Sequence, residues 1–350
     1  MNALRFHWAA PSDSGQSQAT GKYGEGPFSI DAIVEFAQFA EQAGIKSLLM
    51  GISYHMPDPI PLLSVLLRET TSIKFILAYR PGLISPTLFS QVVNTLSWIG
   101  DSRVDLNIVA GISPAEQAYY GDFCDHSQRY ARTKEFLEVV NHLWQSEHMP
   151  YSFEGEFYQI RNAELGVPFQ NGQRPNIYIS GGSLEARDVT GRFGDCLLRY
   201  GDTPDKLSEL ADSLHADNLK LGIRMHVIAR ETREEALYLV SEMSKSPDEE
   251  HRREIAEFVK TCDSQAVLKS FELAQSAEND WLSPMVWSGA VAYRGGPALA
   301  IVGSYDEVAE YLKEYRQAGV DEFILSGWPT RDELEIFCKQ VIPRYKELEA

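Results

Sequence analysis

The residues of this 350-residue chain that could do chemistry stand where short apolar runs end. One such place is the turn Ser180–Ser183, which follows an apolar run, contains two adjacent glycines and precedes a helical pattern. Glycines let backbone N–H groups approach an anion, and a helix N-terminus adds about half a positive charge. The turn therefore predicts a phosphate site, although an ordinary tight turn between a strand and a helix has the same sequence pattern.

A second place is the apolar run 223–229, in which Arg224 and His226 lie two residues apart. On a single strand their side chains point to the same face. Because an arginine buried among apolar groups costs several kcal/mol, we expect that face to be the open end of the fold. There Arg224 would hold an anionic group and His226 would titrate near neutrality. A structural pairing with a carboxylate is the alternative.

A third place is Arg294, which two glycines follow in a long segment without regular periodicity. An arginine beside glycines suits a lid that closes on an anion, and it equally suits a charge on a surface loop. The sequence has no G-x-S-x-G elbow, Walker A motif or Rossmann fingerprint, and its histidines and cysteines lack metal-ligand spacing. These absences disfavour a hydrolase, a P-loop nucleotide site and a metal site.

The elements that must position these residues are eight apolar runs, most of them followed by helical patterns. The predicted strands are 4–10, 47–50, 73–78, 104–109, 176–180, 196–199, 223–229 and 323–325. This alternation is typical of the α/β class with parallel strands. Eight such units predict a (β/α)8 TIM barrel, whose active site lies at the carboxyl ends of the strands. A doubly wound open sheet is the alternative.

The pattern also predicts how the helices begin and end, and where the chain leaves the barrel. Ser29 and Gly44 bound the first helix, Thr203 begins a helix that runs to Lys220, and Thr232 with Glu235 forms a capping box. Residues 151–160 are typical of a β-hairpin. We expect one domain over 1–350, in which residues 244–300 form a long mobile insertion, or lid, before the last βα unit.

Composition narrows the function classes further. The net charge of -18 disfavours nucleic acid and anionic membranes as partners. No apolar run reaches 18 residues, and the N-terminal residues lack a signal-peptide core, so we expect a cytoplasmic protein. The cysteines have no paired spacing and are expected to be reduced thiols: Cys124, Cys196, Cys262 and Cys338.

Seven segments, in order from about Phe6 to Tyr345, resemble one family of flavin enzymes. They are Tyr79-Arg80-Pro81 with 85–87, 107–111 with Glu116, 125–130, 180–183, 222–232, 294–296 and 325–327. Together they resemble the two-component alkanesulfonate monooxygenases, which are bacterial luciferase-like enzymes on a TIM barrel. Residues 222–232 (GIRMHVIARET) match that family's strand-seven pattern nearly residue by residue.

The resemblance implies a monooxygenase that uses O2 and free reduced FMN, which a separate NAD(P)H-dependent flavin reductase supplies. It implies chemistry through a flavin C4a-(hydro)peroxide on a small organic substrate, possibly an alkanesulfonate or another anion, and a homodimer or homotetramer. The cofactor-binding residues that it implies are Tyr79, Asn107, Glu116, Arg129, Tyr130, Ser180, Gly182 and Ser183. The catalytic residues that it implies are Arg224, His226 and Arg294.

Three positions expected in the substrate pocket depart from the family pattern. Tyr54 stands where the family has a cysteine, Tyr200 where it has a tryptophan and Trp328 where it has a tyrosine. Tryptophan cannot ionise as tyrosine can, so an acid or base role at that position is lost. These departures predict an altered substrate. A deazaflavin (F420)-dependent oxidoreductase on the same barrel and a non-catalytic flavin-binding protein are the alternative functions.

Overall fold

The computed structural model describes residues 4–11, 19, 28–145, 149–245 and 248–350. Within them, eight parallel strands are β1 (Arg5–Ala9), β2 (Ser47–Met50), β3 (Lys74–Tyr79), β4 (Val104–Val109), β7 (Ile177–Ser180), β8 (Cys196–Tyr200), β9 (Lys220–Arg224) and β14 (Glu322–Leu325). They close into a barrel in the order β1-β14-β9-β8-β7-β4-β3-β2. The predicted (β/α)8 barrel is confirmed, and the open sheet is excluded.

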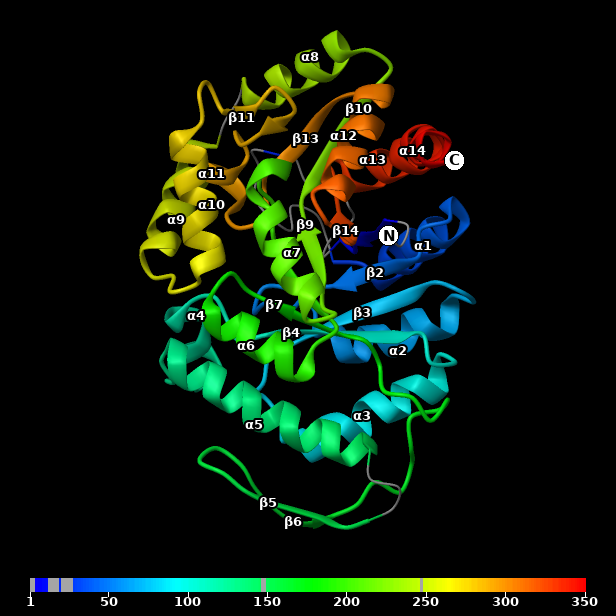
Figure 1. The fold of residues 1–350 in the computed structure, drawn as a ribbon, viewed down its shortest axis with the longest axis vertical. Coiled ribbons are helices and arrows are strands. Elements are labelled where there is room, and N and C mark those ends of the chain that lie inside the picture. Colours follow the sequence, from blue (N-terminus) through cyan, green and yellow to red (C-terminus); the bar gives the residue numbers. More distant parts are fainter. Residues whose placement is uncertain (1–3, 12–18, 20–27, 146–148, 246–247) are drawn as a thin grey trace.

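Helices surround this barrel (Figure 1). Those that follow barrel strands are α1 (Ile30–Ala43), α2 (Pro59–Glu69), α3 (Pro86–Ile99), α4 (Pro114–Tyr119), α5 (His126–Gln145), α6 (Leu184–Phe193), α7 (Ser208–Ala216), α13 (Thr330–Ile336) and α14 (Ile342–Glu349). Ser29 caps α1, Gly44 ends it with a φ of 90°, and both predictions are confirmed. Within the described residues, every helix is too short or too polar to span a bilayer.

The helix expected from Thr203 to Lys220 is wrong in its extent. A short 3-10 turn, Pro204–Lys206, precedes α7, which ends at Ala216. Asn218 has a φ of 58°, a left-handed conformation that stops a helix. Lys220 then begins β9, where its N–H donates to the Asp195 carbonyl at 3.2 Å.

The single strand expected over residues 223–229 is also wrong. The chain forms β9 in the barrel and then β10 (His226–Arg230), with Met225 between them. β10 leaves the barrel and pairs with β13 (Ala300–Ser304) in a four-stranded sheet. The sequence hides this break because residues on both sides of Met225 are paired and buried, so the apolar run is continuous.

The rest of the chain leaves the barrel at two opposite sides of Figure 1. The predicted hairpin forms as β5 (Tyr151–Glu154) and β6 (Gln159–Ala163), below α3 and α5 in this view. After α8 (Arg233–Ser244), whose capping box is confirmed, come α9 (Glu249–Lys260), α10 (Gln265–Ser276), β11 (Trp281–Ser283), β12 (Val286–Trp287) and α11 (Val291–Arg294). α12 (Tyr305–Gln317) follows β13. We call residues 248–297 the insertion.

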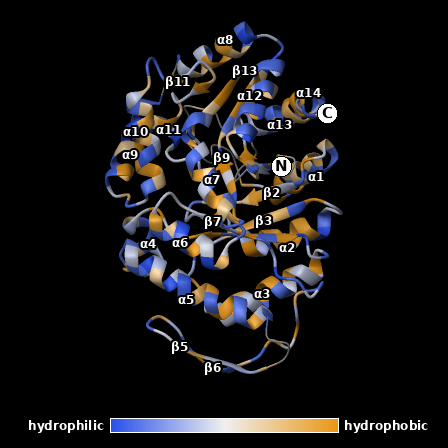
Figure 2. Ribbon diagram, viewed as in Figure 1, coloured by the Kyte–Doolittle hydropathy of each residue, from blue (hydrophilic) through white to orange (hydrophobic). Residues whose placement is uncertain are grey.

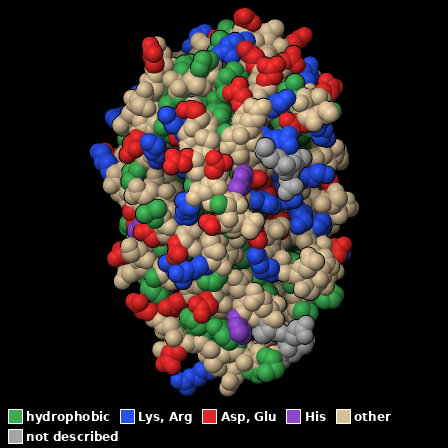
Figure 3. Space-filling view, viewed as in Figure 1, with side chains coloured by type: hydrophobic (Ala, Val, Ile, Leu, Met, Phe, Trp, Pro, Cys, Tyr) green, Lys and Arg blue, Asp and Glu red, His purple; other side chains and the backbone are tan. Residues whose placement is uncertain are grey.

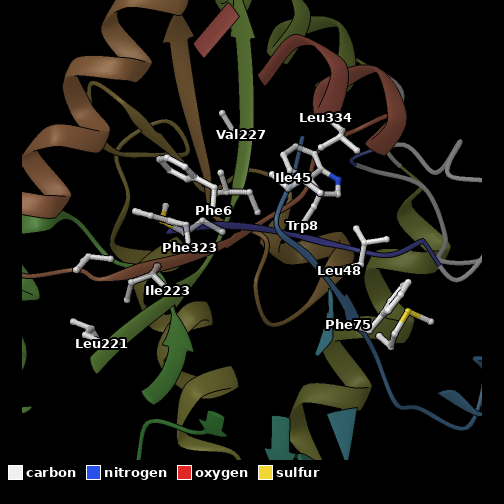
Figure 4. Close-up of a cluster of buried hydrophobic side chains, with 14 of the residues drawn as sticks. Phe6, Trp8, Ile45, Leu48, Phe75, Leu221, Ile223, Val227, Phe323 and Leu334 are labelled. Carbon is white, nitrogen blue, oxygen red and sulfur yellow. The ribbon is translucent and has the colours of Figure 1, made fainter. Parts of the chain in front are cut away.

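The core has two layers because successive strand residues point to opposite sides. Between strands and helices lie large side chains such as Trp8, Phe75 and Phe323, several of which Figure 4 shows together. A second cluster lies inside the barrel and consists of Leu49, Ile76, Tyr178, Cys196, Leu198 and Ile324. The strands are accordingly among the most hydrophobic parts of the chain (Figure 2).

A polar network fills the amino-terminal end of the barrel. Glu322 is 2 % exposed, and it accepts hydrogen bonds from Tyr178 at 2.5 Å, Lys220 at 3.0 Å and His7 at 3.1 Å. The other ring nitrogen of His7 bonds Ser47. Each buried polar group of this network therefore has a partner, as stable interiors require.

Candidate active site

A cavity of about 880 Å³ opens at the carboxyl ends of the barrel strands. Its volume lies within the range of roughly 300–1,000 Å³ that is usual for ligand pockets. The insertion contributes a large part of the wall through residues of α9, the first turn of α10 and the segment 294–297. The site therefore lies where a (β/α)8 barrel places its chemistry, under a cover that is not part of the barrel.

This cavity brings together most of the side chains that the sequence singles out. Those that line it are Arg224, His226, Arg294, Asn107, Glu116, Tyr130, Ser180, Gly182, Ser183, Tyr54, Tyr200 and Trp328. They come from β4, β7, β8, β9, β10 and α11, or from the segments that follow barrel strands, so only the folded chain makes them neighbours.

Tyr79 and Arg129 do not line the cavity and lie behind its wall. Tyr79 stacks on Phe89 with ring centroids 4.1 Å apart. Arg129 is 1 % exposed, and it donates to the Ala110 carbonyl at 2.9 Å and to Asp263 at 2.6 Å. The Arg129 contacts tie the barrel rim to the insertion, so in this structure both residues support the wall.

The turn Ser180–Ser183 forms a backbone cradle at the start of α6, which Ser183 caps. A Cβ atom on Gly181 would lie 2.7 Å from the Tyr130 hydroxyl oxygen, so only glycine allows that approach. Across the turn, a Cβ on Gly182 would lie 3.5 Å from the backbone nitrogen of Ala266 in the first turn of α10. Two helix N-termini thus meet beside a tyrosine hydroxyl, an arrangement that fits a phosphate group.

Glu116 joins the loop after β2 to the rim of the barrel. It forms a buried ion pair with Arg80 at 3.2 Å and accepts a hydrogen bond from Ser53 at 3.0 Å. Nearby, Asn107 accepts a hydrogen bond from Ser180 at 2.7 Å, which fixes the start of the cradle. These contacts make the wall rigid on this side of the cavity.

Arg224 and His226 both line the cavity, although they belong to successive strands. Arg224 donates to the Ser326 hydroxyl at 3.0 Å. The His226 Nδ1 lies 2.7 Å from the Pro297 carbonyl, which can only accept, so Nδ1 carries the proton. Burial and the charge of Arg224 hold the pKa of His226 well below its usual value. The expectation that His226 titrates near neutrality is wrong, and its imidazole is neutral with Nε2 as an acceptor.

The three departures from the family pattern occupy different depths. Trp328 is 4 % exposed and stacks on His226 with ring centroids 3.8 Å apart and planes 10° from parallel. Tyr200 packs against the backbone of Gly296, because a Cβ there would lie 3.0 Å from its hydroxyl. Tyr54 is 57 % exposed at the rim. Trp328 therefore shapes the cavity floor next to His226, while Tyr54 borders the entrance.

Arg294 links the insertion to the loop after β1. Its side chain is 4 % exposed, and its Nε donates to the Ala19 carbonyl at 3.3 Å. The rest of that loop, 12–18 and 20–27, lies outside the described residues. The Asp263 N–H donates to the Ile112 carbonyl at 3.3 Å, so the insertion contacts the rim at a second point. The insertion therefore contacts the loop after β1 and the rim of the barrel beside the cavity.

The sequence analysis missed the insertion's own wall residues and the charge balance of the cavity. His251, Glu254, Ile255 and Phe258 line it from α9, and their spacing of three and four residues was the available signal. Among the described lining residues, the arginines are Arg80, Arg199, Arg224 and Arg294, against two glutamates. The cavity is thus cationic in a chain of net charge -18, and the face of the molecule drawn in Figure 3 carries both signs mixed together.

The polar side chains of the cavity do not form a recognisable metal site within the described residues. Among the described residues, no group of three or more His, Cys, Asp or Glu side chains is placed to hold a metal ion. The cysteines are all free.

Solved structures with this fold come from several flavin and deazaflavin enzymes. EDTA monooxygenase (EmoA) from Chelativorans sp. BNC1 is 20% identical with a TM-score of 0.79, over 99% of this chain and 95% of that one. Long-chain alkane monooxygenase (LadA) is 17% identical with a TM-score of 0.80, over 100% and 92%. An F420-dependent secondary alcohol dehydrogenase is 17% identical with a TM-score of 0.67, over 98% and 99%.

Identities of 20% or less show a shared fold only. The family of this chain is shown instead by a match to a family sequence profile. The profile of the luciferase-like monooxygenases matches residues 4–322, which is most of the chain and spans β1 to the start of β14. The matched range includes the cradle at Ser180–Ser183, the Arg224 and His226 pair and Arg294. On this match the chain belongs to the luciferase-like monooxygenase family.

Proposed function

We propose that this protein is the oxygenase of a two-component flavin system, in which a separate NAD(P)H-dependent reductase supplies reduced FMN and O2 oxidises a small organic anion. One observation carries the proposal. A single cavity joins a phosphate cradle at Ser180–Ser183 to a neutral histidine, His226, and to the arginines Arg224 and Arg294.

The residues present fit FMN. Its phosphate would lie at the N-terminus of α6, within reach of the Ser183 backbone and the Tyr130 hydroxyl, with the first turn of α10 facing it. When bound, reduced FMN supplies the electrons that activate O2.

The protein's part is to exclude water and to hold charge and protons in place. His226 stays neutral because it is buried, so it offers a lone pair at Nε2 and cannot deliver a proton prematurely. Arg224 and Arg294 provide fixed positive charge for negative charge that develops on oxygen. Trp328 covers one face of His226 and keeps water from it. In this proposal residues 244–300 act as a lid of the single domain 1–350, and the molecule forms a homodimer or homotetramer.

The substrate that suits this cavity is an anion. Arg224 and Arg294 line the cavity outside the cradle Ser180–Ser183, so they provide positive charge for a second anionic group. An alkanesulfonate is one such substrate. Tyr54, Tyr200 and Trp328 give the pocket larger or differently shaped aromatic groups than that family has, which favours another small organic anion.

The proposal is tested by mixing the protein with reduced FMN without oxygen and then adding oxygen while following absorbance. We expect tight binding of reduced FMN and a transient absorbance that belongs to neither reduced nor oxidised FMN. The variant Gly181→Ala tests the cradle. Its added Cβ would collide with Tyr130, so we expect it to bind reduced FMN about tenfold more weakly than the wild type does. Tight binding without any oxygen-dependent transient contradicts an oxygenase. NADPH oxidation by this chain alone contradicts the two-component arrangement, and alcohol-dependent reduction of F420 would favour the alternative cofactor.

A further inference from the structure

The inner face of α9 contributes a polar and an apolar half to the cavity wall. His251, Glu254, Ile255 and Phe258 are spaced by three and four residues, so they share one face of the helix, and each of them lines the cavity. α9 packs on α11, the short helix that ends with Arg294, and Ile255 lies 3.9 Å from the Cβ position of Gly295. This wall is therefore attached to the segment that carries the catalytic arginine.

One ring nitrogen of His251 is held by Glu254. Its Nδ1 lies 3.2 Å from a carboxylate oxygen of Glu254, and because a carboxylate only accepts, Nδ1 must donate. Its backbone N–H donates to Asp248 at 2.9 Å, which caps α9 and fixes where the residue stands. In the neutral ring, Nε2 is then a lone-pair acceptor.

That acceptor is buried and has no protein partner. His251 is 7 % exposed, and among the described residues its Nε2 has no hydrogen-bond partner. Buried polar atoms in stable proteins are nearly always paired, and leaving one unpaired is unfavourable. The contrast with His7, whose two ring nitrogens are both bonded inside the barrel, shows how a purely structural histidine is arranged here.

We propose that His251 binds the substrate, with Nε2 accepting a hydrogen bond from an O–H or N–H group. The apolar part of the substrate lies against Ile255 and Phe258, and its anionic group is held by cavity arginines. This inference rests on the proposed function and narrows the substrate class to an amphipathic organic anion that carries a hydrogen-bond donor away from its anionic group.

The test compares two probes that differ in one hydroxyl group, hexane-1-sulfonate and 6-hydroxyhexane-1-sulfonate. Their dissociation constants are measured by anaerobic calorimetry on the full chain saturated with reduced FMN. For the wild type we expect the hydroxylated probe to bind about tenfold more tightly, which is the usual effect of one buried hydrogen bond. For His251→Phe we expect that preference to vanish while hexane-1-sulfonate binds within about twofold of the wild type.

Two further variants keep the test decisive. His251→Gln places a carbonyl oxygen near the Nε2 position and should restore part of the preference. In Glu254→Gln the amide N–H can donate to Nδ1, so the His251 ring can carry its proton on Nε2 instead. Nε2 then no longer accepts, and the preference for the hydroxylated probe should fall. No preference in the wild type, a preference that survives in His251→Phe, or no binding of either probe overturns the inference. A preference that depends on His251 in a protein without the oxygen-dependent transient would support the inference and contradict the proposed oxygenase.

Discussion

The two ends of the barrel use buried charge in opposite ways. At the amino-terminal end, Glu322 is surrounded by His7, Tyr178 and Lys220, and every one of these groups bonds another. At the carboxyl end, a cavity is bordered by groups that include Arg224, Arg294, His226 and His251. The same strands thus end in a satisfied network on one side and in groups that line a cavity on the other, which is the division between stability and chemistry expected in this fold.

The difference is visible in how burial acts on each titratable group. Burial by itself would raise the pKa of Glu322, but the hydrogen bonds from His7 and Tyr178 and the charges of His7 and Lys220 outweigh it and lower that pKa to about 2. At the other end, burial lowers the pKa of His226, and the charge of Arg224 adds to the effect. The first group stabilises the fold as an ion, and the second is kept neutral beside the cavity.

The largest effect that would sharpen this comparison is expected at the carboxyl end. Arg294→Ala should lower turnover about 1,000-fold, because fixed charge at developing negative charge is worth roughly 4 kcal/mol of barrier. Affinity for reduced FMN should change less than about threefold, since the cradle at Ser180–Ser183 is separate. Steady-state kinetics with the reductase and anaerobic FMN titration measure the two quantities. Turnover close to wild type would remove Arg294 from the mechanism.

The amino-terminal end should respond in stability alone. Glu322→Gln keeps the shape but removes the carboxylate, and the lowering of its pKa from 4.5 to about 2 corresponds to about 3 kcal/mol of unfolding free energy. This contribution is complete above about pH 4.5 and is lost as pH falls toward about 2. Urea unfolding at pH 7 and pH 3 measures it. A variant as stable as the wild type at pH 7 would contradict the role of the network.

A smaller effect on stability is expected from His226, which is buried as a neutral group, whereas Glu322 is buried as an ion. Because its pKa is lowered by folding, the unfolded chain takes up a proton first, near pH 6.5, and the folded state loses stability as pH falls below that value. The loss should be about 1.4 kcal/mol between about pH 7.5 and pH 5.5. Urea unfolding of His226→Asn, which cannot titrate, should lack this loss. Equal slopes in both proteins would show that His226 does not stay neutral.

The smallest effect is expected where the insertion contacts the barrel. Asp263→Asn weakens the contact with Arg129, and because Asp263 is partly exposed the loss of stability should stay below about 1 kcal/mol. Hydrogen exchange should nevertheless rise in α9 and α10, and reduced FMN should bind about threefold more weakly. Asp248→Asn, which keeps the cap of α9, is the matched control. Unchanged exchange would show that this ion pair does not hold the insertion.

Local sequence determined the parts of this protein that depend on neighbouring residues. The eight apolar runs, the caps at Ser29 and Thr232, and the glycine turn before α6 are all set by periodicity and backbone preferences that act within a few residues. Because barrel strands end at one common mouth, most of the site residues predicted from these runs and their motifs line the cavity.

Tertiary structure decided what depends on distant partners. The apolar run 223–229 divides at Met225 because β13, some seventy residues later, provides a second sheet for its far half. Burial by that arrangement sets the pKa of His226, which local sequence could not reveal. The polar face of α9 resembles any solvated helix until the insertion folds over the barrel and places His251 against the cavity. Periodicity thus specified the barrel and its mouth, and long-range packing specified the environment in which the chemistry occurs.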